Sequence, residues 1–208
     1  DWLGDDQRQA ILHVLKTSDR ITGLRGLAGT GKTTALRELV NACKEIKIEP
    51  LFCAPTSAAT DVLRKEGFHA VTLQSLLVSK QLLSNRNLIV LDEAGAVGID
   101  DMKQLFDLAK DCRIVLSGDT GQHGSVARGD ALRLLEQHSN FQSGQLTRIR
   151  RQRRAEYRRA VELAAQKRMV EAFAQLERMD AVKEFSGGKL HDSAAQAYVK
   201  ALNQNQSV

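Results

Sequence analysis

The sequence is poor in the residues that crosslink, interrupt or rigidify a chain. Among 208 residues it has two prolines, three cysteines and 4% aromatic residues, with no internal repeat and no Pro/Gly-rich linker. Cys43, Cys53 and Cys112 form no CxxC pair and have no histidine at metal-ligand spacing. We therefore expect buried, reduced thiols, as in a cytosolic protein, rather than disulfides or a zinc site.

Long hydrophobic segments are also missing. The mean hydropathy is -0.31, and no apolar run approaches the roughly 20 residues that a helix needs to cross a bilayer. Residues 1–6, Asp-Trp-Leu-Gly-Asp-Asp, contain no Met, no basic stretch and no apolar stretch. The sequence thus predicts no membrane insertion, no secretion signal, a cytoplasmic location, and a chain cut from inside a longer protein.

Positive charge is concentrated in one place. The net charge is +5, and residues 148–159 contain seven arginines and one glutamate; without this stretch, 23 basic and 24 acidic residues remain. Such a cluster suits contact with the phosphates of DNA or of a nucleotide. It is equally typical of a solvated helix face, and both interpretations stay open at this point.

Short apolar runs alternate with helical patterns along most of the chain. The runs predicted as strands are residues 21–24, 51–54, 88–91 and 114–116. The helices predicted between them run from Asp5 or Asp6 to Lys16, from Lys32 to Lys44, from Ser57 to near Gly67, and from a cap at Asp100. This alternation predicts an α/β fold, with a parallel sheet flanked by helices on both faces.

The C-terminal quarter follows a different pattern. Residues 155–179 read as helical, followed by a possible short strand at 181–185 and a last helix at 193–202. We predict a main domain at residues 1–150. Residues 151–208 are predicted to be a helical connection and the start of a further, truncated domain.

Residues 26–33 satisfy the pattern G-x-x-x-x-G-K-[ST] in full, between a predicted strand and a predicted helix. In this pattern the glycines let backbone N–H groups point at phosphate oxygens, and the start of the helix adds its positive end. Lys32 would reach the β- and γ-phosphates, and the Thr33 hydroxyl would ligate Mg²⁺. The alternative interpretation is a glycine-rich turn followed by a lysine that matches the pattern by chance. The motif predicts a P-loop NTPase without saying which one.

Two carboxylates, Asp92 and Glu93, follow the apolar run at 88–91. Adjacent side chains at the end of a strand point in different directions, so Asp92 is placed to hold Mg²⁺ and Glu93 to activate a water. An Asp-Glu pair can also cap a helix, but a complete P-loop upstream favours the hydrolytic role and argues against small-molecule kinases.

The next apolar run ends in Gly118-Asp119-Thr120-Gly121-Gln122, where Gln122 could sense the γ-phosphate. With this third segment the sequence resembles superfamily 1 helicases of the RecD-like group over about 150 residues. The matching segments, in chain order, are residues 3–11, 26–34, 54–59, 72–77, 92–95, 118–122 and 146–152.

A narrower resemblance is to the helicase part of TraI/TrwC-type conjugative relaxases. It rests on residues 118–129, with His123 after the glutamine, and on Ile149-Arg150-Arg151-Gln152. The relaxase itself, with its tyrosine nucleophile and histidine metal site, has no counterpart here. The resemblance implies that residues 1–150 form a RecA-like first motor lobe and that 151–208 begin a truncated second lobe.

The family resemblance also implies the ligands. ATP would be held by Gln7 at the adenine edge and by the phosphate loop, and Mg²⁺ by Thr33 and Asp92. The loop residues concerned are Gly26, Gly29, Thr30, Gly31, Lys32, Thr33 and Thr34. Lys32, Glu93, Gln122 and Arg151 would be catalytic, with Arg148 and Arg150 competing for the place of Arg151 at the γ-phosphate.

Single-stranded DNA is the implied partner, contacted at Pro55, Thr56 and Thr72. The two threonines could instead cap the helices that follow them, and both roles can hold at once. The implied activity is ATP-driven travel in the 5′ to 3′ direction in the bacterial cytoplasm. A second helicase lobe and a relaxase domain are expected in the same full-length chain.

Two other functions remain open. One is an inactive helicase copy that holds single-stranded DNA, which the intact Lys32, Asp92 and Glu93 argue against. The other is an unrelated P-loop nucleotide kinase, which leaves residues 54–59 and 118–122 unexplained. For the chain alone we expect weak ATP binding and little hydrolysis, because half of the cleft is missing.

Overall fold

Six parallel strands form one sheet in the order β3-β2-β4-β5-β1-β6. The computed structural model describes residues 3–27, 29–79, 83–119, 130–152, 154–184 and 189–203. The chain divides into two units, residues 1–152 and 153–208. The strands are β1 (Ile21–Gly26), β2 (Glu49–Ala54), β3 (Ala70–Thr72), β4 (Asn87–Leu91), β5 (Arg113–Gly118) and β6 (Ser143–Leu146). The predicted α/β fold class is therefore confirmed.

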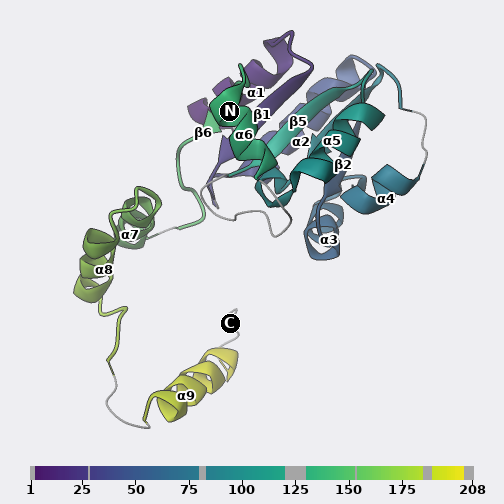
Figure 1. Cartoon of the computed structure of the whole chain (residues 1–208). Helices are drawn as coiled ribbons and strands as arrows, with labels where there is room; N and C mark the ends of the chain where they lie inside the picture. Colours follow the sequence, from purple (N-terminus) through teal and green to yellow (C-terminus); the bar gives the residue numbers. More distant parts are fainter. Residues whose placement is uncertain are drawn as a thin grey trace. The chain divides into compact units, whose positions relative to one another are not determined.

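Helices cover both faces of this sheet (Figure 1). They are α1 (Asp5–Lys16), α2 (Lys32–Glu45), α3 (Ser57–Lys65), α4 (Leu73–Val78), the 3₁₀ turn η1 (Ala94–Ala96), α5 (Ile99–Leu108) and α6 (Ala131–His138). Successive side chains of a strand point to opposite faces. Leu88 and Val90 of β4 therefore join one core with α1, α2 and α3, while Ile89 and Leu91 join the other with α4, α5 and α6.

The central strands coincide with the predicted apolar runs, whereas the edge strands β3 and β6 were missed. A strand buried on both faces is apolar at every position, which makes it visible in sequence. The edge strands have only three and four residues, and they include the polar Thr72, Ser143 and Gln145. Nothing in such short, mixed segments separates them from loops.

Two predicted helix caps were wrong. Gly4 and Gly98, rather than Asp5, Asp6 or Asp100, occupy the N-cap positions of α1 and α5. The acidic residues lie inside the first turns, where they still interact favourably with the helix dipole. Gly67, by contrast, follows the end of α3 with a φ of 88°, as predicted for a glycine that stops a helix.

The unit at residues 153–208 contains α7 (Ala155–Ala165), α8 (Met169–Arg178) and α9 (Lys189–Asn203). The continuous helical stretch predicted at 155–179 is interrupted after α7, where Lys167 has a φ of 63°. The strand predicted at 181–185 is wrong for residues 181–184. There the N–H of Ala181 donates to the carbonyl of Leu176, which closes the end of α8 instead of pairing with a strand. The last predicted helix corresponds to α9.

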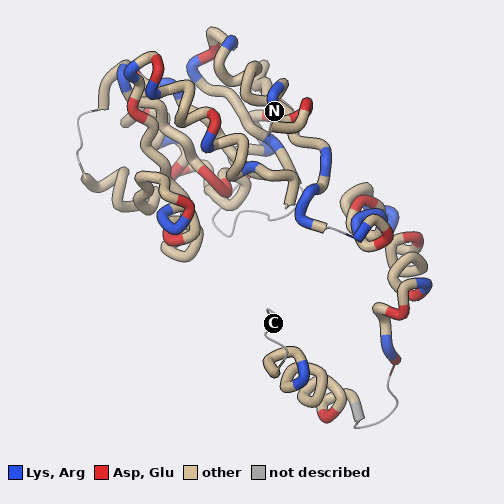
Figure 2. The backbone as a smooth tube through the Cα atoms, turned by 180° about the vertical axis from the view of Figure 1, so that it is seen from behind, with Lys and Arg blue, Asp and Glu red and all other residues tan. Residues whose placement is uncertain are grey.

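The arginine cluster lies on the stretch after β6 and continues into α7, where blue marks the basic residues in Figure 2. All three cysteines are free, and all three are buried, which agrees with the expected burial. Among the helices of the described residues, none is both long enough and apolar enough to span a membrane.

Candidate nucleotide-binding site

The carboxyl ends of β4, β5 and β1 lie side by side because these strands are neighbours in the sheet. The glycine-rich loop follows β1, Asp92 and Glu93 follow β4, and Asp119 follows β5. All three segments line one pocket of about 550 Å³. Open α/β sheets bind their ligands at this edge, and the volume suits a nucleotide.

The loop between β1 and α2 has the backbone that a phosphate cradle requires. Gly29 and Gly31 have φ values of 81° and 84°, in the left-handed region that glycine adopts at low cost. The helix α2 starts at Lys32, so its first N–H groups and its positive end face the pocket. Lys32 and Thr33 line the pocket with Thr34.

Two contacts hold this loop in shape from within. The ammonium of Lys32 donates to the carbonyl of Gly26 at 2.8 Å, and the hydroxyl of Thr30 donates to the carbonyl of Leu27 at 2.8 Å. Thr30 is fully buried, and neither Thr30 nor Gly26 lines the pocket. These two predicted ligands therefore lie beneath the cradle, where they support it.

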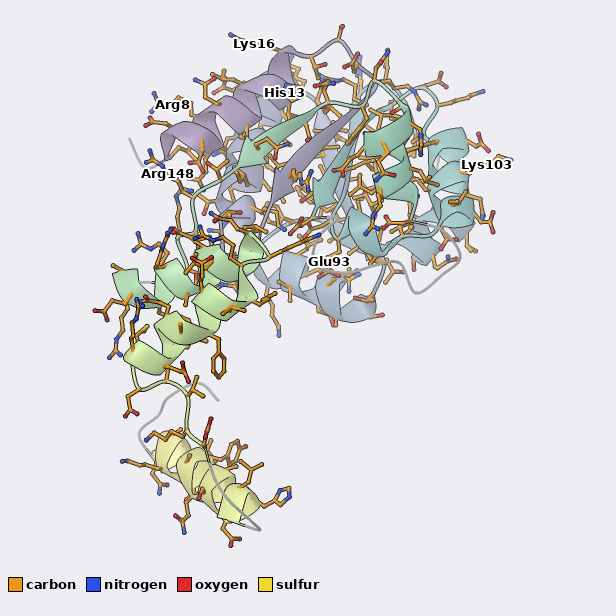
Figure 3. All side chains as sticks on the ribbon, turned by 60° about the vertical axis from the view of Figure 1, so that its left-hand side comes forward. Arg8, His13, Lys16, Glu93, Lys103 and Arg148 are labelled. Atoms are coloured by element: carbon orange, nitrogen blue, oxygen red, sulfur yellow. The ribbon has the colours of Figure 1, made fainter. Side chains whose placement is uncertain are left out.

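The two carboxylates differ in environment. Asp92 is half-buried, and its Oδ1 accepts a hydrogen bond from the hydroxyl of Ser117 at 2.8 Å. Glu93 is exposed at the same edge of the sheet (Figure 3) and has a φ of 53°. A non-glycine residue in this region is strained, and such strain tends to persist at functional sites. One carboxylate is thus fixed in place while its neighbour is turned toward solvent.

The donor set fits ATP with Mg²⁺. The described residues include no group of three or more His, Cys, Asp or Glu side chains suited to a metal. Thr33 and Asp92 nevertheless line the same pocket, and Mg²⁺ is usually bound by one or two protein oxygens together with water and substrate phosphates. Thr33 and Asp92 could therefore supply the protein ligands of a Mg²⁺ that is also bound to substrate phosphates.

Gln7 lies next to the cradle without lining the pocket. Its side chain is 2% exposed. The amide oxygen accepts from the N–H of Gly4 and the amide nitrogen donates to the carbonyl of Gly31, each at 3.0 Å. Each end of an amide has capacity for a second hydrogen bond. Recognition of adenine by Gln7 stays a prediction.

The structure separates the three competing arginines. Arg150 and Arg151 line the pocket, whereas Arg148 does not. The segment that carries them lies against the cradle, because the N–H groups of Arg150 and Arg151 donate to the carbonyl of Gly29 at 2.7 Å and 3.0 Å. A Cβ added at Gly29 would lie 2.7 Å from the Cβ of Arg151, so a glycine is required there for close approach as well.

The residues predicted to contact DNA gather around neighbouring strand ends. Thr56 follows β2 and caps α3 through the N–H of Ala59, and Thr72 ends β3 and caps α4 through the N–H of Ser75; both hydrogen bonds measure 3.1 Å. The capping roles are confirmed. Pro55 is half-buried beside Thr56. DNA contact by these residues stays a prediction.

Gln122 and His123 lie outside the described residues. What the structure brings together is therefore the phosphate loop, Asp92, Glu93, and Gly118 and Asp119 at the end of β5.

Sequence reasoning missed several residues at this site. Ser117 is a polar residue directly after the apolar run at 114–116, a signal that could have identified it. Arg37 and Glu66 also line the pocket and form an ion pair at 2.5 Å, with no motif to mark them. Asp6, which binds the arginine segment, has partners more than 140 positions away along the chain and left no local signal.

A family model described as an AAA domain matches residues 2–187. TraI of Escherichia coli K12, named a multifunctional conjugation protein, is 35% identical over 151 residues, which cover 66% of this chain and 9% of TraI. The conjugal transfer protein TraA of Rhizobium radiobacter is 32% identical over 165 residues, covering 76% of this chain and 15% of TraA. The chain thus spans a small part of these relatives.

Two helicase structures share the fold. A structure of two coordinating Pif1 helicases at forked double-stranded DNA has a TM-score of 0.64, covering 88% of this chain and 52% of that one. Pif1 helicase from Candida albicans has a TM-score of 0.61, covering 78% of this chain and 44% of that one. Both are 18% identical to this chain, so these similarities bear on fold alone.

Proposed function

The chain belongs to the AAA-domain family, and it is related to the TraI conjugation proteins, as the sequence motifs predicted. We propose that it is an ATP-dependent DNA helicase lobe. It would bind ATP and Mg²⁺ in the pocket at the ends of β4, β5 and β1. ATP hydrolysis there would drive movement along single-stranded DNA in the 5′ to 3′ direction.

One observation carries the proposal. A loop with two left-handed glycines, a lysine at the start of a helix, and two carboxylates of different environment line a single pocket. A binding protein for an uncharged ligand has no use for this combination. A nucleoside triphosphate with Mg²⁺ needs each part of it.

Each side chain then has a distinct task. Lys32 and the N–H groups at the start of α2 bind the β- and γ-phosphates. Thr33 and Asp92 hold Mg²⁺, which neutralises charge on the phosphates when bound. Glu93 orients the attacking water and accepts its proton. We assign Arg151 to the γ-phosphate, Gln122 to sensing whether it is present, and Gln7 to the adenine.

The DNA would lie near Pro55, Thr56 and Thr72. Thr56 is exposed at the start of α3, where the N–H groups of a helix favour phosphate. Contacts of this kind recognise the backbone and not the bases, so we expect little sequence preference and strong salt dependence.

The whole protein would be larger than this lobe. TraI and TraA are many times the length of the matched region, and TraI is named as a multifunctional conjugation protein. We propose that a second helicase lobe and a relaxase domain occur in the same full-length chain, in the bacterial cytoplasm. The second lobe would complete the ATP cleft.

The test is ATP hydrolysis by the full-length protein with and without single-stranded DNA, compared with Lys32→Ala and Glu93→Gln. We expect DNA to stimulate hydrolysis and both variants to abolish it, with Glu93→Gln still binding ATP. Lys44→Ala, an exposed lysine in the last turn of the same helix, is the matched control and should behave as the wild type.

Two results would contradict the proposal. Tight binding of single-stranded DNA with no hydrolysis by the wild type would favour an inactive helicase copy. DNA-independent transfer of phosphate to a nucleotide acceptor would favour a kinase.

A further inference from the structure

The carboxylate of Asp6 joins the first turn of α1 to the segment that follows β6. Its Oδ2 accepts from the N–H of Thr147 at 3.1 Å and from the N–H of Arg148 at 3.0 Å. The guanidinium of Arg150 donates to Oδ1 at 2.5 Å and to Oδ2 at 3.2 Å. The Asp6 side chain is 10% exposed. One carboxylate thus accepts four hydrogen bonds from three residues of a distant segment.

The charge of Asp6 is retained in this setting. Burial alone would raise the pKa of its carboxyl group. The hydrogen bonds from Arg150, Arg148 and Thr147, together with the positive charge of Arg150, hold the pKa well below its usual value. Asp6 is therefore an ionised anchor at neutral pH.

Arg150 carries the connection on to the phosphate cradle. Besides Asp6, its Nη1 donates to the carbonyl of Thr30 at 3.1 Å and to the carbonyl of Arg148 at 3.2 Å. Its backbone N–H donates to the carbonyl of Gly29, as does that of Arg151. The guanidinium of Arg150 is thus occupied by Asp6 and by backbone oxygens.

Arg151 is held differently. Its backbone is fixed to Gly29, but its guanidinium, exposed at the rim of the pocket, pairs with no side chain or carbonyl among the described residues. Three arginines line the pocket. Arg37 is paired with Glu66 and Arg150 with Asp6, so Arg151 is the one whose charge is available to a ligand.

We propose that Asp6 is a positioning residue that, through Arg150, fixes residues 147–151 against the phosphate loop so that Arg151 faces the γ-phosphate. This proposal rests on the proposed function, because it needs a triphosphate in the cradle. In this proposal Arg150 holds the segment in place, and Arg151 contacts the γ-phosphate. The start of α1 thereby controls discrimination between ATP and ADP, although Asp6 touches neither.

The experiment compares affinity for ADP and for a non-hydrolysable ATP analogue, each with Mg²⁺, measured by equilibrium titration of the 208-residue chain. The quantity of interest is the affinity for the ATP analogue divided by the affinity for ADP. Asp6→Asn should lower that ratio roughly tenfold, the effect of a misplaced charge-assisted contact, while changing ADP affinity little. Arg151→Ala should lower the ratio at least as much.

Asp5→Asn is the matched control. This substitution removes the same charge from the same helical turn, and the exposed side chain of Asp5 forms no hydrogen bond or ion pair with the described residues. It should leave the ratio unchanged. Arg150→Lys is a second route to the same test, since a lysine keeps the charge but cannot span Asp6 and Thr30 together. Thermal unfolding of each variant separates misfolding from mispositioning.

A double variant decides whether Asp6 acts through Arg151. In the Arg151→Ala background, Asp6→Asn should change the ratio no further, because the group it positions is gone. Additive effects on the ratio, or an unchanged ratio in a folded Asp6→Asn chain, would overturn the proposal. Equal affinities of wild type and Lys32→Ala for both nucleotides would instead overturn the proposed function itself.

Discussion

The hydroxyl of Ser117 donates a 2.8 Å hydrogen bond to Oδ1 of Asp92, across the neighbouring strands β5 and β4. Ser117 is fully buried, so the carboxylate meets a fixed donor on one side and the pocket on the other. Groups that orient a metal ligand contribute to metal affinity without touching the metal.

Ser117→Ala should weaken the use of Mg²⁺ by the nucleotide site. Losing the donor leaves Asp92 free to rotate, and we expect the Mg²⁺ concentration for half-maximal nucleotide binding to rise roughly tenfold. Titration of Mg²⁺ at fixed nucleotide measures this. Thr22→Val removes another buried strand hydroxyl, one that bonds to the carbonyl of Gln142 away from the pocket, and should leave the Mg²⁺ dependence unchanged. An equal shift in both variants would mean a general loss of stability.

Thr56→Asp separates capping from DNA contact. Aspartate caps a helix at least as well as threonine, so the melting temperature should stay close to that of the wild type. A negative charge at the start of α3 should lower affinity for single-stranded DNA roughly fivefold at low salt. Thr56→Ala should instead destabilise the fold by about 1 kcal/mol through loss of the cap. Unchanged DNA affinity in the aspartate variant would restrict Thr56 to its structural role.

Gly118→Ala should impair hydrolysis more than binding. A Cβ at this position would lie 3.2 Å from the backbone nitrogen of Ala94 and 3.4 Å from that of Gly95, in the turn that holds Glu93 in its left-handed conformation. We expect kcat of the full-length protein to fall roughly tenfold or more, with ATP affinity within about twofold of the wild type. A loss of binding with unchanged kcat would show that the turn does not control Glu93.

The buried thiol of Cys53 should make the protein less stable at alkaline pH. Burial, with the nearby charge of Asp92, raises the pKa of this thiol from 9.0 to about 12. The unfolded thiol ionises first as pH rises, so this contribution to stability is complete below pH 9 and is lost progressively between pH 9 and 12. The free energy of unfolding, measured with denaturant across this pH range, should fall more steeply for the wild type than for Cys53→Ala. Parallel curves would contradict the assignment.

Much of the fold is visible in the sequence because burial is locally encoded. Residues 88–91 are apolar at every position because β4 lies in the middle of the sheet with helices on both faces. The phosphate loop is equally local, since its glycines, lysine and threonine lie within eight positions. The order of the motifs predicted that Asp92 and Glu93 lie beside the phosphate loop, and the pocket that they share with it agrees with this prediction.

The sequence did not reveal contacts between residues that lie far apart along the chain. The contact between Asp6 and Arg150 joins residues 144 positions apart, and nothing at either position distinguishes it from a surface charge. The run of arginines also concealed which one was available to a ligand, until Arg150 was seen bound to Asp6 and Thr30. The edge strand β6 was missed for a related reason, because its register depends on β1 and not on its own composition.

The central claim is that one pocket binds a triphosphate with Mg²⁺ between the glycine loop and the Asp92–Glu93 pair. A crystal structure of the chain with Mg²⁺ and a non-hydrolysable ATP analogue tests it most directly. The account predicts phosphates against Gly29, Gly31 and Lys32, with Mg²⁺ near Thr33 and Asp92. A nucleotide bound elsewhere, or bound with Asp92 and Glu93 away from its phosphates, would contradict it.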